Sequence, residues 1–220
     1  MGTAPAEPAA PAAASSARTR IAARLALGAL VLVYVALAAL FAAPGSNVVL
    51  ATAGGSPAWL LGPLRALGWS GADGAAAGPV FYLGLWLALF LYVLVLAGSR
   101  AIGPRLAVAS IVVLHAVYLL APPLLSQDVF SYISYARLGV LHDLNPYSHS
   151  PDAVPGDAVY PFAGSKDATS AYGPLFTVAT YPLANLSVAT AFWTLKAAMA
   201  AGSLAVVGLT WACATRLGRG

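Results

Sequence analysis

Long apolar runs separated by short polar breaks dominate the chain. Four of these runs cover residues 21–43, 79–97, 106–122 and 190–214. A helix rises 1.5 Å per residue, so about 20 apolar residues cross about 30 Å of hydrocarbon. The break at residues 98–105 is rich in Gly and Pro and carries two arginines, which predicts a helical hairpin. The pattern predicts an all-α polytopic transmembrane protein with four crossings.

The segments outside these runs differ in character. Residues 1–20 are rich in Ala, Pro and Ser and lack large apolar side chains, so we expect a disordered tail ahead of a transmembrane domain at 21–220. Two loops, 44–78 and 123–189, separate the runs on one side of the membrane. The second loop contains no run long enough to span, although 174–186 is compatible with a half-buried or re-entrant helix.

Charge placement predicts the orientation, because arginines that flank spans are retained on the cytoplasmic side. Seven arginines flank the predicted spans on one side: Arg18, Arg20, Arg24, Arg100, Arg105, Arg216 and Arg219. Six aspartates fall on the other: Asp73, Asp128, Asp143, Asp152, Asp157 and Asp167. We therefore expect a multi-pass inner (plasma) membrane protein with both termini cytoplasmic and loops 44–78 and 123–189 outside.

Composition supports the membrane assignment and excludes other classes. Of the 220 residues 60% are hydrophobic and 8% are charged, against about a quarter charged in soluble domains, so a bilayer must solvate most of the surface. The net charge of +4 is less informative than the placement of the basic residues along the chain, and no nucleic-acid partner is indicated. Cys213 is the single cysteine, which excludes an intramolecular disulfide framework or a cysteine zinc cluster. The histidine spacing predicts no metal site.

Residues 126–141 have the pattern of an amphipathic helix. One face carries apolar side chains at helical spacing: Val129, Ile133, Ala136 and Val140. The neighbouring face carries a carboxylate and two hydroxyls: Asp128, Tyr132 and Tyr135. We expect an interfacial helix on the outer leaflet, with Ser126 as its N-cap and Asp128 in the first turn. An aspartate there is most often a capping charge, and catalysis is the alternative.

Three segments of the second loop carry a family resemblance: residues 126–132 (SQDVFSY), 144–147 (LNPY) and 171–176 (AYGPLF). They resemble membrane-embedded C-type glycosyltransferases that use polyprenyl-phosphate sugars, and are closest to actinobacterial α-(1→6)-mannosyltransferases of lipomannan assembly. The resemblance implies a C-type fold. It also implies inverting mannosyl transfer to a cell-envelope glycan or glycolipid at the outer face of the plasma membrane. The family's catalytic base matches Asp128.

The resemblance also implies partners for the donor and acceptor. The lipid phosphate is the leaving group and needs a cation, for which Arg137 ranks ahead of Lys166 and Lys196. For Lys196, snorkelling of the side chain to the headgroups is the alternative explanation. The other candidate substrate-binding residues are Tyr132, Asn145, Tyr147 and Tyr172, with interfacial anchoring or turn formation as alternatives. No cofactor is expected besides the polyprenyl-phosphate mannose donor or a similar sugar.

Members of this family are much longer, so the sequence is interpreted as an amino-terminal fragment. The alternative to an enzyme is a non-catalytic membrane accessory or scaffold protein, or an inactive fragment, whose exterior loop binds glycan or a partner. In that case replacing Asp128 leaves function intact. A small transporter is disfavoured because charged residues inside the predicted spans are almost absent.

Overall fold

The computed structural model describes residues 10–46, 48–49 and 56–218. Within these ranges the chain is helical and contains no strand. Its extended segments meet in one isolated bridge, between Val49 and Leu124. The chain divides into two compact units, the first made of Met1–Leu37 and Gly78–Val117 and the second of Ala38–Ala77 and Tyr118–Gly220. The all-α fold predicted from the apolar runs is confirmed.

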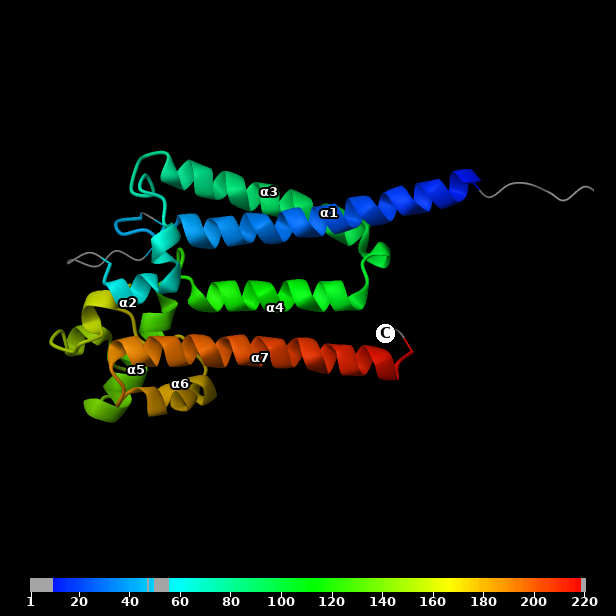
Figure 1. The fold of residues 1–220 in the computed structure, drawn as a ribbon. Coiled ribbons are helices and arrows are strands. Elements are labelled where there is room, and N and C mark those ends of the chain that lie inside the picture. Colours follow the sequence, from blue (N-terminus) through cyan, green and yellow to red (C-terminus); the bar gives the residue numbers. More distant parts are fainter. Residues whose placement is uncertain (1–9, 47, 50–55, 219–220) are drawn as a thin grey trace, which may run out of the picture. The chain divides into compact units, whose positions relative to one another are not determined.

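Long apolar helices build the first unit, and the last residues of two of them belong to the second. These elements are α1 (Ala10–Leu40), α3 (Ala77–Ala97), the 3-10 turn η2 (Ser99–Ala101) and α4 (Pro104–Leu120). Helices α1 and α3 lie side by side (Figure 1), and a Cβ on Gly98 would lie 2.6 Å from Cβ of Ala23. The glycine therefore allows close helix packing, as small residues do in membrane proteins.

Helix α1 begins at Ala10, ahead of the predicted span at 21–43. This corrects the prediction of disorder for residues 10–20, while residues 1–9 lie outside the described residues. The physical reason is composition, because alanine is the strongest helix former and the segment is rich in it. The helix ends at Leu40, earlier than predicted, and Pro44 follows the turn that closes it.

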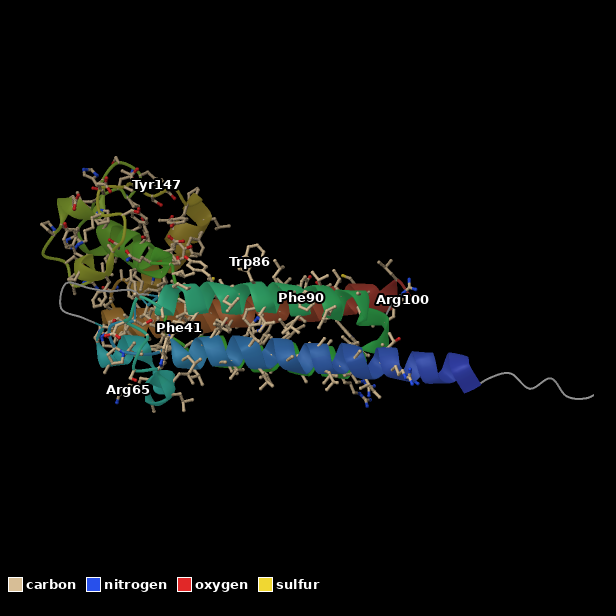
Figure 2. The ribbon with its side chains drawn as sticks, turned by 90° about the horizontal axis from the view of Figure 1, so that it is seen from above. Phe41, Arg65, Trp86, Phe90, Arg100 and Tyr147 are labelled. Carbon is tan, nitrogen blue, oxygen red and sulfur yellow. The ribbon has the colours of Figure 1, made fainter. Side chains whose placement is uncertain are left out.

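Three described helices are long and apolar enough to cross a membrane, by length and composition: Arg18–Leu40, Ala77–Ala97 and Val188–Arg216. Helix α4 is also apolar but, with Pro104–Leu120, is shorter. On α3 the large side chains of Trp86 and Phe90 project outward and are 69% and 60% exposed (Figure 2). Such a surface suits lipid rather than water.

The second unit contains most of the predicted exterior segments. Its elements are α2 (Ala58–Leu61), η1 (Pro63–Leu67), α5 (Asp128–Leu141), η3 (Pro151–Ala153), η4 (Tyr160–Phe162), α6 (Pro174–Thr180), η5 (Tyr181–Leu183) and α7 (Val188–Arg216). Helix α5 packs against α6, η5 and the N-terminal part of α7. The long loop therefore folds around α5. The helix expected within 174–186 is α6, in which Thr177 and Thr180 are buried and Leu175 and Val178 are exposed.

Stacked aromatic rings form the centre of this unit. The Phe130 ring stacks on Phe162 and Phe192 with centroid distances of 5.2 and 5.5 Å. Trp59 packs edge-on against Phe192 at 5.7 Å. Phe130 and Phe192 are fully buried, and burial of one such ring stabilises a fold by about 1.5–3 kcal/mol. The rings join α2, α5, η4 and α7 into one core.

The apolar stripe predicted for α5 is only partly at the protein surface. Ile133 and Ala136, from the predicted apolar stripe, are fully buried in the protein, while Val140 is 38% exposed. The stripe packs against protein because α6, η5 and α7 cover it. The predicted helical period is confirmed, but the predicted contact of the stripe with lipid is wrong for Ile133 and Ala136.

Candidate functional site

A cavity of about 280 Å³ lies where the start of α5 meets α7. Its polar wall consists of Ser126, Asp128, Tyr132 and Lys196. Its apolar wall includes Leu124 and Phe192. The fold thus brings together three of the predicted site residues, Asp128, Tyr132 and Lys196. The first two lie near the start of the predicted loop 123–189, and Lys196 follows its end. A carboxylate, a phenol and an ammonium in one cavity can move a proton and bind an anion.

The first turn of α5 places Asp128 at the cavity. The helix begins at Asp128 with Gln127 in the N-cap position, so the cap lies one residue after the predicted Ser126. The Ser126 hydroxyl still accepts a hydrogen bond from the Asp128 amide, at 3.2 Å. Asp128 therefore lies at the positive end of the α5 dipole, which attracts negative charge. Asp128 is exposed and free to meet a substrate.

Aromatic side chains surround this carboxylate. The Tyr172 hydroxyl donates a long hydrogen bond of 3.4 Å to Oδ1 of Asp128. The Tyr132 ring lies edge-on to Tyr172 and Phe176, with centroid distances of 4.6 and 4.8 Å. Phe176 belongs to the motif at 171–176, but the sequence predicted no role for it. Together these rings form an aromatic wall of the kind that binds the apolar face of a sugar.

Both tyrosines keep their protons at neutral pH. Burial, followed by the negative charge of Asp128, raises the pKa of Tyr172 to about 12. The same causes, in the same order, raise the pKa of Tyr132. A phenol with a raised pKa stays neutral and can donate a hydrogen bond. Tyr172 is therefore a permanent donor to Asp128 in the physiological range.

Replacing Tyr172 with Phe should lower the rate of a reaction that uses the Asp128 carboxylate by about threefold to tenfold, because one long hydrogen bond to a charged group is lost while the ring remains. The measurement is the rate of the reaction proposed below, with the full-length protein in membranes. Tyr160→Phe is the matched control, since its hydroxyl donates to Asp152, outside the cavity. Unchanged activity in Tyr172→Phe would show that its hydroxyl does not position Asp128.

Lys196 extends from α7 toward the end of α4. Its Nζ donates to the carbonyl oxygen of Ala121 and lies over the Trp193 ring, 4.9 Å from the centroid, and over Phe192 at 5.4 Å. No ion pair joins Lys196 to Asp128 in the described part of the chain. The cavity wall thus holds an acid and a cation that form no ion pair with each other in the described part of the chain.

Arg137 lies elsewhere, although the sequence ranked it first as a phosphate partner. Its Nε donates to Oδ1 of Asp157 at 2.7 Å, and a terminal nitrogen donates to the carbonyl oxygen of Ala184 at 2.8 Å. The side chain is 14% exposed and does not line the cavity. Arg137 ties α5 to the segment that leads into α7.

Asp157 was not singled out from the sequence, yet it is the centre of a charged cluster. It accepts hydrogen bonds from Arg137, from Nε2 of His142 at 2.7 Å and from the Val159 amide at 2.9 Å. Burial raises the pKa of Asp157, but the hydrogen bonds from Arg137, His142 and Val159 outweigh it, so the pKa lies below the ordinary value. The spacing of Arg137, His142 and Asp157 in the sequence matches no known motif, so the cluster becomes visible only in the fold.

Asn145 and Tyr147 connect the sequence motifs. The Asn145 side-chain oxygen accepts a hydrogen bond from the Tyr147 amide at 2.9 Å. This contact forms an Asx turn, in agreement with turn formation as the alternative role of Asn145. The Tyr147 hydroxyl bonds to the Tyr172 carbonyl at 2.9 Å and to Oγ1 of Thr177 at 3.0 Å. The motif at 144–147 thereby holds the motif at 171–176 in place, and Tyr172 in turn reaches Asp128.

The fold and cavity define a class: a helical membrane protein with a polar site at the ends of its helices. A family model described as "Alpha-(1->6)-mannopyranosyltransferase, N-terminal domain" matches residues 25–220. The chain belongs to this mannosyltransferase family, which confirms the resemblance carried by the three motifs. No curated protein and no solved structure matches the chain.

Proposed function

We propose that this protein transfers mannose from a polyprenyl-phosphate donor to a hydroxyl of a cell-envelope glycan or glycolipid. Membership in the mannosyltransferase family supports glycosyl transfer in general. The observation that carries the finer proposal is the cavity in which Asp128, Tyr132 and Lys196 meet at the end of an apolar helix. A lipid-linked sugar presents its reacting carbon at this level of a membrane.

The proposed reaction is a single displacement with inversion. Asp128 takes the proton from the acceptor hydroxyl, and the oxygen attacks the anomeric carbon of mannose. The bond from that carbon to the phosphate oxygen breaks, and its electron pair leaves with polyprenyl phosphate. Lys196 stabilises the charge that develops on the phosphate. Tyr132 and Tyr172 contact the sugar and keep the carboxylate in place.

The proposed orientation puts both termini in the cytoplasm and the cavity at the outer face of the plasma membrane. Its support is the charge pattern in the sequence. Arginines flank one end of each of α3, α4 and α7, and the aspartates lie in the predicted exterior loops at the other ends. The partners are then membrane lipids, the lipid-linked donor and a glycan or glycolipid acceptor, all of which reach this face.

The proposal is tested with membranes that contain the full-length protein and labelled donors. We expect mannose to be transferred from polyprenyl-phosphate mannose, and not from a nucleotide-linked mannose when synthesis of the lipid donor is blocked. Transfer directly from the nucleotide sugar would contradict the donor class. Absence of transfer, with the protein present and folded, would favour the non-catalytic scaffold.

Replacing Lys196 with Met should lower the transfer rate by about 100-fold, because the leaving phosphate loses its cationic partner. The methionine keeps the length of the side chain and suits the apolar rings of Phe192 and Trp193. The rate is measured at saturating acceptor, with Lys166→Met as the matched control, since Lys166 lies over the Tyr160 ring outside the cavity. Equal rates in both variants would exclude Lys196 from the reaction.

A further inference from the structure

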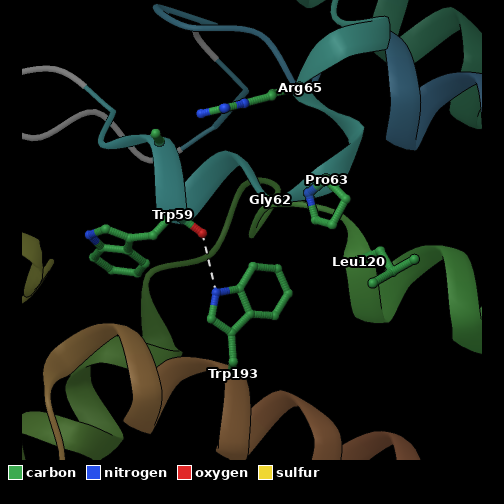
Figure 3. A pocket seen from close by; sticks show the side chains of 7 residues that line it. Trp59, Gly62, Pro63, Arg65, Leu120 and Trp193 are labelled. Carbon is green, nitrogen blue, oxygen red and sulfur yellow. Dashed lines mark hydrogen bonds between the residues drawn. The ribbon is translucent and has the colours of Figure 1, made fainter.

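A second, larger cavity is lined by the Trp193 side chain and has no part in the proposed transfer. It measures about 510 Å³, within the range of about 300–1,000 Å³ that is typical of ligand sites. Its walls are Trp59, Gly62, Pro63, Leu120 and Trp193, with Arg65 as the charged residue. Asp128 does not line it. Figure 3 shows the Trp193 indole pointing toward Gly62 and Pro63, next to Leu120.

The walls of this cavity are fixed by the fold. The Trp193 Nε1–H donates to the Trp59 carbonyl oxygen at 3.2 Å, so the two tryptophan residues hold α2 on α7. Gly62 has a φ of +66°, and a Cβ there would lie 2.6 Å from the Leu120 carbonyl oxygen and 2.9 Å from the Trp193 ring. Only glycine fits this conformation and this approach without displacing its neighbours. The cavity is a built feature rather than a gap between loose segments.

The cavity's surroundings indicate an amphiphile. Leu120 ends α4, and Trp193 lies near the start of α7, a helix long enough to cross a membrane. Helix ends with tryptophan side chains lie at the level of the lipid headgroups. Arg65 is exposed, and no carboxylate of the described residues forms an ion pair with it. An apolar cavity beside such a guanidinium matches an acyl chain attached to a phosphate.

We infer that this cavity binds an anionic phospholipid of the surrounding membrane, with one acyl chain against the Trp193 indole and the phosphate on Arg65. The occupant is a resident lipid rather than the sugar donor, because no carboxylate lines the cavity and no group there can take a proton from an acceptor. The inference does not depend on the proposed function.

The test uses native mass spectrometry of the full-length protein in mild detergent, titrated with phosphatidylglycerol or phosphatidylcholine of identical acyl chains. We expect wild type to retain phosphatidylglycerol in preference to phosphatidylcholine. Arg65→Gln should weaken phosphatidylglycerol binding by about tenfold, the effect of losing one charge-assisted contact. Ala58→Phe, which places a ring at a cavity wall, should weaken binding of the same lipid.

Arg100→Gln is the matched control, since it removes the same charge at a residue that does not line the cavity, and it should bind like wild type. Equal retention of the two lipids by wild type would overturn the inference without any variant. An equal loss in Arg100→Gln would show that binding depends only on net charge. One-for-one displacement of phosphatidylglycerol by polyprenyl-phosphate mannose would assign the cavity to the donor instead.

Discussion

Replacing Asp128 with Asn should lower mannosyl transfer by about 100- to 10,000-fold while the protein still folds, because a general base contributes this much to a rate. Asparagine keeps the shape of the side chain, and its carbonyl oxygen can still accept the long hydrogen bond from Tyr172. It cannot take up a proton from the acceptor. The change thus removes the proposed general base and keeps its surroundings.

The experiment compares initial transfer rates at equal amounts of membrane-inserted protein. Asp167→Asn is the matched control, because Asp167 is an exposed aspartate of the same loop that does not line the cavity, and it should retain the wild-type rate. Full activity in Asp128→Asn would reduce Asp128 to a helix-capping charge. A loss that equals the loss in Asp167→Asn would point to the overall negative charge of the loop.

Replacing Asp157 with Ala should destabilise the second unit by about 3–5 kcal/mol, the cost of removing one partner of a buried ion pair. The Asp157 side chain is 4% exposed, and without it the Arg137 Nε and the His142 Nε2 lose their acceptor. The measurement is chemical or thermal unfolding in detergent. Asp152→Ala, at an exposed aspartate whose side chain bonds only to the Tyr160 hydroxyl among the described contacts, should change stability by less than about 0.5 kcal/mol.

A double variant separates the ion pair from simple side-chain truncation. Arg137→Met together with Asp157→Leu replaces both charges with apolar groups, and it should be more stable than Asp157→Ala alone. If the double variant is as unstable as the single one, the cluster acts through its geometry and not through the unpaired charge. His142 remains in both variants and therefore does not account for the difference.

Acid pH should have the same effect as the Asp157 substitution. The folded-state pKa of Asp157 is lower than the ordinary value of 3.8, so its contribution to stability is present above that pH. The contribution is lost as the pH falls from 3.8 through the folded-state pKa, where the native carboxylate takes up its proton. The unfolding temperature of wild type should therefore fall more steeply in that range than the unfolding temperature of Asp157→Ala.

The sequence predicted what depends on local pattern. The apolar runs located α3, α4 and α7 to within two residues at each end, since burial in lipid requires uninterrupted apolar composition. The period of residues 126–141 predicted α5 and put Asp128 in its first turn. The sequence-based prediction was wrong for residues 10–20, which are helical because of their alanine content although they lack large apolar side chains.

Long-range contacts could not be predicted from these patterns. The sequence ranked Arg137 ahead of Lys196 as a phosphate partner, but in the fold Arg137 pairs with Asp157 and Lys196 lines the cavity with Asp128. Segment 150–170 has no recognisable motif, yet it supplies Asp157 to the charged cluster and Phe162 to the core. Helical spacing predicts which residues share a face, but it does not predict which distant segment covers that face.

The N-terminal part of α7 also fixes the rotation of the helix about its own axis. Phe192 packs in the aromatic core, Trp193 lines the larger cavity and Lys196 lines the smaller one. Successive residues of a helix are about 100° apart around its axis, so a turn of one residue would move all three to wrong surroundings at once. A rotation of α7 about its axis would therefore change the lining of both cavities at once.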